Sequence, residues 1–124
     1  MSYGPTEKDF MVSNYHQWLD LRNLAMHRCA LDRIRQDHSL IETIIRPTLK
    51  GWMSKCDASG IRCLKEWESI ISLPFDELKT ACLKTDERTT ALRQSSPIPC
   101  VLSNRERFAI INLWRIPHGE KKPD

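Results

Sequence analysis

Hydrophobic residues recur every three or four positions along most of this chain, and this spacing places them on one face of an α-helix. The longest such stretch covers residues 7–36. Asparagine is a favoured N-cap residue, so Asn14 is expected to begin the main helix. The stretch before Asn14 is expected to be a separate short helix or a frayed N-terminal extension. The predicted inward stripe of the long helix consists of Tyr15, Trp18, Leu21, Leu24, Ala25, Cys29, Leu31 and Ile34.

A second helix is predicted to begin at Ser39. Ser39 and Glu42 have the spacing of a capping box, in which each side chain accepts a hydrogen bond from the other residue's backbone N–H. Pro47 lies inside this helix, and because proline has no N–H and clashes with the preceding turn, we expect a kink or a break at Ile45–Arg46. The predicted inward face carries Ile41, Ile45, Leu49, Trp52 and Cys56.

Four more helical segments follow in the pattern. Ser59 is a plausible N-cap for the first, Pro74 suits the first residue of the second, and residues 85–94 form the third. Ser103 and Glu106 make another capping box, which opens the last helix. The inward positions predicted for these segments are Ile61, Leu64, Trp67, Ile70, Ile71, Phe75, Leu78, Cys82, Phe108, Ile110, Ile111 and Trp114.

The pattern therefore predicts an all-α fold, a compact single-domain bundle of five or six helices with short connections. Only residues 98–102 could be extended, and they are too few to build a sheet. We expect one helical domain over residues 1–117 and a flexible polar tail over residues 118–124. The crossing at residues 95–102 contains two prolines among apolar residues, so we interpret it as an ordered hinge that is pinned to the core.

Composition adds limits to this picture. The chain has 124 residues, 40% of them hydrophobic and 28% charged, which is typical of a globular domain. No stretch is apolar enough to span a membrane, and the N-terminus lacks the features of a secretory signal, so we expect a cytoplasmic protein. The five cysteines are then predicted to be reduced and mostly buried as small hydrophobes.

Catalytic and metal-binding patterns are not found. The cysteines and histidines lack the close pairs that a zinc site needs, and the acidic pairs near helix starts are explained by the helix dipole. Cys100 follows two prolines and could be an exposed nucleophile, but its apolar neighbours favour a place in the core. We therefore predict no enzyme activity, no cofactor and no metal, and expect surface histidines.

Nucleic-acid binding has more support. The net charge is only +3, but residues 46–65 carry five basic side chains against one acidic one. Two helices joined by a turn with Gly60 have the outline of a helix-turn-helix motif, and the alternative is an ordinary helical hairpin with a solvated basic side. The residues predicted to contact nucleic acid are Lys50, Lys55, Arg62 and Lys65.

Protein binding is the other class that the residues favour. Tryptophan is common in helical cores and also at the centres of protein interfaces, and each of the four tryptophans lies in an apolar stripe. We expect most of them in the core. Around the hinge, Arg93, Gln94 and Arg105 are expected to be exposed. The predicted partner-binding residues are Arg93, Gln94, Arg105 and Trp114.

The last part of the chain, residues 91–115, carries a distinctive set of residues, namely Leu92, Arg93, Gln94, Ser95, Ser96, Pro97, Leu102, Glu106 and Arg107. With these residues it resembles the ending of a group of small, uncharacterised bacterial helical proteins that are associated with mobile elements and toxin–antitoxin-like gene pairs. The chain departs from that pattern at residues 98–100, where Phe-Ala-Gly or a similar run is expected.

The resemblance implies an antitoxin-like or accessory role, carried out by binding a partner. Our leading hypothesis is therefore a non-catalytic regulatory protein that binds another protein, such as the product of an adjacent gene. A homodimer is left open. The alternative hypothesis is a DNA-binding transcriptional repressor that uses the hairpin around Gly60.

Overall fold

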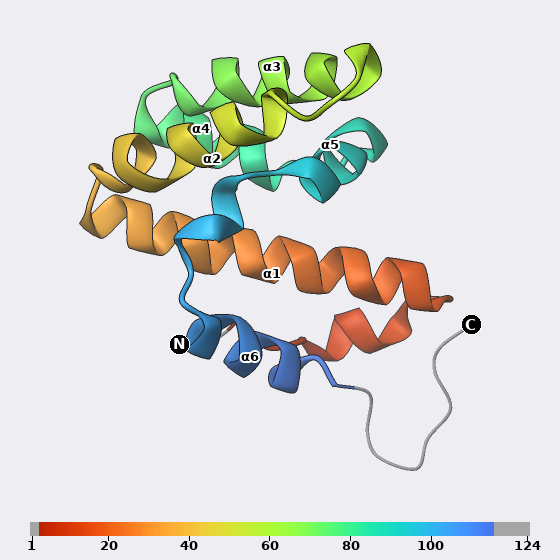
Figure 1. Ribbon diagram of the computed structural model, residues 1–124. Helices are drawn as coiled ribbons and strands as arrows, with labels where there is room; N and C mark the ends of the chain where they lie inside the picture. Colours follow the sequence, from red (N-terminus) through yellow and green to blue (C-terminus); the bar gives the residue numbers. More distant parts are fainter. Residues whose placement is uncertain (1–2, 116–124) are drawn as a thin grey trace.

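A single long helix, α1 (Tyr15–Gln36), forms the middle of the molecule in the computed structural model, which describes residues 3–115. Helix α6 and the N-terminal 3₁₀-helix lie on one side of α1, and helices α2 to α5 lie on the other (Figure 1). The predicted all-α fold is confirmed, and the described residues contain no strand. The predicted tail, residues 118–124, lies outside the described residues.

The remaining elements follow the order that the sequence predicts. None of the helices in residues 3–115 is long and apolar enough to cross a membrane. The α-helices are α2 (Arg46–Met53), α3 (Ala58–Ile71), α4 (Phe75–Leu83), α5 (Glu87–Leu92) and α6 (Asn104–Leu113), with 3₁₀-helices at Glu7–Met11, Arg93–Ser95 and Ile98–Val101 and a π-helix at Ile41–Ile45.

Helix α1 begins as predicted, because the Asn14 side chain accepts a hydrogen bond from the backbone of Gln17 at 2.9 Å. Its buried side extends over the length of the helix, which is why other elements can pack on opposite sides of it. The buried residues of α1 are Trp18, Ala25, Met26, His27, Cys29, Ala30, Leu31 and Ile34.

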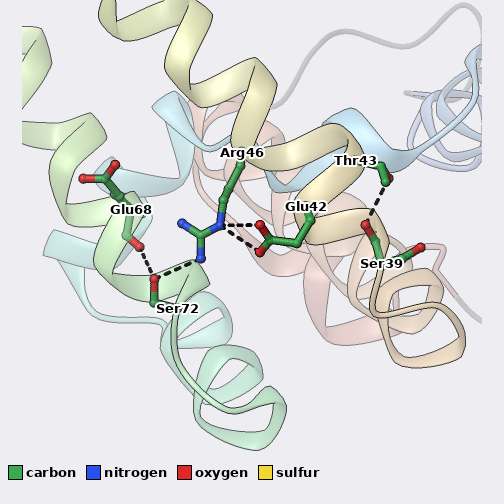
Figure 2. Close-up of polar contacts among 6 residues, drawn as sticks. All are labelled: Ser39, Glu42, Thr43, Arg46, Glu68 and Ser72. Carbon is green, nitrogen blue, oxygen red and sulfur yellow. Dashed lines mark hydrogen bonds and ion pairs between the residues drawn. The ribbon is translucent and has the colours of Figure 1, made fainter.

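The second helix starts differently from the prediction. The carboxylate of Asp37, two residues earlier, accepts hydrogen bonds from the backbone N–H and the hydroxyl of Ser39. The Glu42 carboxylate is turned away from Ser39 and binds Arg46 instead (Figure 2). The predicted capping box at Ser39 is therefore wrong, because a nearer acceptor takes the Ser39 donors.

Pro47 changes the helix without interrupting it. The Arg46 N–H donates to the Ile41 carbonyl, five residues back, which is the π-helical pattern, and α2 continues from Arg46. The discontinuity falls at the predicted place, Ile45–Arg46, as a change of hydrogen-bond register and not as a break. Further along, α3 is capped by Asp57, whose carboxylate accepts from the Gly60 N–H at 2.9 Å, so the predicted cap at Ser59 is wrong.

The proline-containing crossing is an ordered hinge, as predicted. Residues 93–95 and 98–101 form 3₁₀-turns, and Pro97, Ile98 and Leu102 are buried. The capping box of Ser103 and Glu106 then opens α6, with both hydrogen bonds present. One inward position of α6 is wrong, because Phe108 is 62% exposed while Ile110 and Trp114 are buried.

Three of the four tryptophans are buried, as expected, and each buried indole N–H donates to a backbone carbonyl. Trp18 donates to the Trp114 carbonyl at 2.8 Å, Trp114 to Tyr3 at 2.6 Å and Trp67 to Leu92 at 3.0 Å. These bonds compensate for removing polar indole groups from water. They also tie α6 to the N-terminal segment and α3 to the end of α5.

The cysteines are less buried than predicted. Cys29 and Cys82 are buried, and burial raises the pKa of the Cys82 thiol to about 12. Cys100 is half-buried. Cys56 and Cys63 are exposed, so the predicted inward position of Cys56 is wrong, because α2 ends at Met53 before that residue.

His27 is fully buried, against the expectation of surface histidines. Its ring is stacked on Trp67, and its Nδ1 lies 2.8 Å from the Asn23 carbonyl oxygen. A carbonyl can only accept, so Nδ1 carries the proton, and Nε2 has no hydrogen-bond partner. Burial, with the positive charge of Arg93 as a smaller cause, lowers the pKa of His27 to about 4.

This burial predicts a loss of stability in mild acid. The unfolded chain takes up a proton at His27 near pH 6.5, whereas the folded chain resists protonation until about pH 4. The stabilising contribution is therefore complete above pH 6.5 and falls by about 2 kcal/mol between pH 7 and pH 5. Urea unfolding followed by tryptophan fluorescence measures this loss.

The matched variant is His27→Leu, which leaves the carboxylates to titrate as in the wild type. We expect the difference between pH 7 and pH 5 to be about 2 kcal/mol smaller in the variant. Equal pH dependence in the two proteins would show that His27 does not carry the effect.

Candidate functional site

Arg93, the first residue predicted to bind a partner, is buried with only 4% of its surface exposed. Its guanidinium donates to the carbonyl oxygens of Cys82 at 2.8 Å and Lys84 at 2.6 Å, and to the Thr90 hydroxyl at 3.2 Å. The expectation of an exposed Arg93 is wrong, because the side chain folds back onto the C-terminal end of α4. Positive charge is favoured there by the helix dipole.

The other three predicted partner-binding residues are not brought together. Gln94 is exposed just before the hinge, where its amide donates to the Asp20 carboxylate at 3.2 Å. Arg105 is exposed in the first turn of α6. Trp114 is only 3% exposed and packs edge-on against Trp18, so it belongs to the core. Of the predicted set, Gln94 and Arg105 remain on the surface.

The outer side of α6 is a surface that the sequence pattern did not indicate. The side of α6 that faces α1 is anchored by Ile110 and Trp114, and the opposite side is in contact with solvent. Phe108 is 62% exposed and Leu113 is 51% exposed on that side. We define the outer α6 face as Arg105, Phe108, Ala109, Asn112 and Leu113, all of which are exposed.

Helical geometry could have revealed this face. Positions 105, 108, 109, 112 and 113 follow the spacing of one helix face, opposite to positions 110 and 114. Once Trp114 and Ile110 are placed inward, Phe108 has to point outward. The predicted inward set contains both Phe108 and Trp114, although six helical positions turn their directions about 120° apart, a third of a turn.

The basic hairpin is exposed as predicted. Lys50, Lys55, Arg62 and Lys65 are all on the surface, and no ion pair engages them within residues 3–115. In Figure 1, α2 and α3 lie side by side and run in opposite directions, as an antiparallel hairpin. The helices of a helix-turn-helix motif instead cross at a steep angle. The antiparallel arrangement favours a basic surface that attracts nucleic acid electrostatically over a pair of helices that reads a DNA groove.

Arg46, the fifth basic residue of this region, is already engaged. Its Nε lies 2.8 Å from Glu42, and its Nη2 donates to the Ser72 hydroxyl at 3.2 Å (Figure 2). Ser72 in turn donates to the Glu68 carbonyl at 3.0 Å. This chain of contacts ties the π-helical segment to the end of α3 and serves the packing of α2 on α3.

Cys100 lines a cavity of about 290 Å³ and does not plug into the core as expected. The cavity lies where α1, α2, the hinge and α6 meet, and no carboxylate is among its lining residues. Arg107 is held at its edge by a 2.9 Å hydrogen bond from Nη2 to the Pro99 carbonyl. The polar and aromatic lining includes Arg22, Asn23, Trp52, Ser96, Cys100 and Arg107.

The residues that line this cavity are spread over the chain from position 22 to position 107, so no local motif could have grouped them. The cations and amides around it offer hydrogen-bond donors and positive charge. Within residues 3–115, no group of three or more histidine, cysteine or acidic side chains is arranged to hold a metal ion.

Comparison with models of known protein families, with curated protein sequences and with solved structures finds no match to this chain.

The buried guanidinium of Arg93 yields a stability prediction. Arg93→Met keeps a long side chain but leaves the Cys82 and Lys84 carbonyls without their donor. Because unsatisfied buried acceptors are costly, we expect a loss of about 2–4 kcal/mol in the free energy of unfolding. Urea unfolding at pH 7 provides the measurement.

Arg105→Met is the control, since Arg105 is exposed on the surface of α6. That variant should stay within about 0.5 kcal/mol of the wild type. If both variants lose the same amount, Arg93 has no special structural role.

Proposed function

We propose that this protein is a cytoplasmic, antitoxin-like regulatory protein without catalytic activity, which binds another protein through the outer α6 face. The observation that carries the proposal is the exposure of Phe108 and Leu113 on a helix whose other side is firmly packed. Aromatic and arginine side chains contribute most to protein interfaces, and Arg105 lies on the same face as Phe108. The resemblance of residues 91–115 to accessory proteins points the same way.

The outer α6 face is rigidly positioned. The capping box fixes the start of α6, Trp18 binds the Trp114 carbonyl at its end, and Glu106 pairs with Arg33 of α1 at 3.1 Å. A face that is held in place before binding loses little conformational entropy when a partner docks. This supports a preformed interface more than one that has to fold on binding.

The chemistry of the face suits a helix of the partner. Ala109 is small and lets another backbone approach, while Phe108 and Leu113 flank it with apolar surface. Arg105 and Asn112 supply hydrogen-bonding groups between them. Helices dock in this way through positions three and four residues apart.

Phe108→Glu tests the interface. The substitution puts a charge in the apolar part of the proposed contact, so the complex with the product of the adjacent gene should weaken at least about 100-fold. Co-expression followed by size-exclusion chromatography with light scattering shows whether the complex forms, and calorimetry gives the affinity. The fold should be unaffected, because Phe108 is already exposed.

Leu73→Glu is the matched control, since Leu73 is another exposed apolar residue and lies on the opposite side of α1, after α3. It should bind like the wild type. A wild-type chain that forms no complex and stays monomeric would contradict the proposal. A homodimer that Phe108→Glu dissociates would assign the face to a second copy of the chain.

DNA binding is the second candidate. It is favoured by the exposure of four cations on α2, α3 and the turn between them, none of which forms an ion pair with another described residue. Arg62→Glu with Lys65→Glu should abolish a mobility shift on the DNA upstream of the gene, and the wild-type shift should weaken steeply with salt. Absence of any wild-type shift at low salt would remove this candidate. Phe108→Glu should leave such a shift unchanged, which separates the two functions.

A further inference from the structure

The cavity beside Cys100 has the chemistry of an anion site. Three arginines line it. The guanidinium of Arg93 is already bound to the carbonyls of Cys82 and Lys84, which leaves Arg22 of α1 and Arg107 of α6. The amide of Asn23 and the hydroxyl of Ser96 lie in the same lining. Its lining includes no carboxylate that would neutralise these cations. Its volume of about 290 Å³ is close to the lower end of the range for cavities that hold small molecules.

The two guanidinium groups are available to a ligand. Arg22 is half-buried, and within residues 3–115 no hydrogen bond or ion pair engages its guanidinium. Arg107 uses one N–H on the Pro99 carbonyl, and an arginine has five N–H donors in all. That bond fixes the orientation of Arg107 and leaves the other donors for an anion. Planar guanidinium groups suit phosphate oxygens, which they can contact in pairs.

One acidic side chain lines a neighbouring cavity instead. Asp20 lies in a neighbouring cavity of about 280 Å³, which shares Arg22, Asn23 and Gln94 with the first. The Asp20 carboxylate accepts a hydrogen bond from the Gln94 amide, at the boundary between the two cavities. It therefore borders the site without occupying it.

The remaining lining is apolar and includes an aromatic side chain. Trp52 is half-buried and is the one tryptophan outside the buried core, and Met26 and Pro99 lie with it in the lining. An aromatic face of this kind stacks against a planar group of a ligand. The site thus combines a cationic side for a phosphoryl group with an aromatic side for the group that the phosphate carries.

We propose that this cavity binds a small phosphate monoester that carries a planar ring, of the class of a nucleoside monophosphate. Arg22 and Arg107 bind the phosphoryl oxygens, and Trp52 contacts the ring. The proposal does not depend on the outer α6 face, since its residues are different and the two can fail separately.

Adenosine 5′-monophosphate is the first probe, with adenosine, inorganic phosphate and succinate as comparisons. Calorimetry with the full chain should show binding of the nucleotide at least about tenfold tighter than binding of any of the other three. Arg22→Gln and Arg107→Gln should each weaken nucleotide binding at least about tenfold, because each removes one cation from the phosphoryl group. Arg105→Gln, two residues from Arg107 but on the outer α6 face, should bind like the wild type.

A second readout does not require variants in the site. In the Cys56→Ser/Cys63→Ser protein, which lacks the two exposed thiols, alkylation by iodoacetamide reports chiefly on Cys100. Saturating nucleotide should slow that reaction at least about fivefold, because the ligand would cover the cavity. The proposal is overturned if the nucleotide binds more weakly than about 10 mM, if adenosine binds as tightly, or if bound nucleotide leaves the alkylation rate of Cys100 unchanged.

Discussion

The hydrogen bonding of the buried Arg93 guanidinium is the constraint on which the second half of the fold depends. A cation removed from water needs acceptors for its N–H groups, and Arg93 finds them in the carbonyls at the end of α4 and in Thr90. Its own carbonyl accepts from Asn23 of α1 at 3.3 Å. One residue thus joins α4, α5 and α1. It lies where the chain leaves helices α2 to α5 and enters the crossing. Because the acceptors are neutral carbonyls and not a carboxylate, their geometry matters more than opposite charge.

The position of the crossing then determines both surfaces for which a function is proposed. Trp67 donates to the Leu92 carbonyl just before the crossing, and Ile98 and Leu102 bury its apolar side against α1. The chain emerges on the far side of α1, where α6 packs beside the N-terminal segment and has solvent on its outer side (Figure 1). The cavity beside Cys100 forms at the place where the crossing passes between α1, α2 and α6.

Local chemistry explains which features could be predicted from the sequence. The helices, the Asn14 cap and the Ser103–Glu106 box depend on residues within one turn of each other, so spacing alone identified them. The caps at Ser39 and Ser59 failed because Asp37 and Asp57 stand two residues away and are equally suitable in sequence. Arg93 and His27 failed for a different reason, since burial of a polar side chain depends on carbonyls and rings from distant helices. The cavity could not be predicted at all, because its residues meet only in the folded chain.

Residues of helix α6 that are close in sequence face three different surroundings. Trp114 and Ile110 face α1, Arg107 faces the cavity and Phe108 faces solvent. Successive helical residues point about 100° apart, so adjacent positions can contact entirely different surroundings. This separation is useful only if the helix does not rotate, and the capping box, the Glu106–Arg33 pair and the bond from Trp18 to the Trp114 carbonyl together hold it at both ends. For a ligand in the cavity to change the binding of a partner at the outer α6 face, α6 would need two alternative arrangements. With α6 held in this way, we infer that the cavity, to which α6 contributes Arg107, and the outer α6 face act as independent sites.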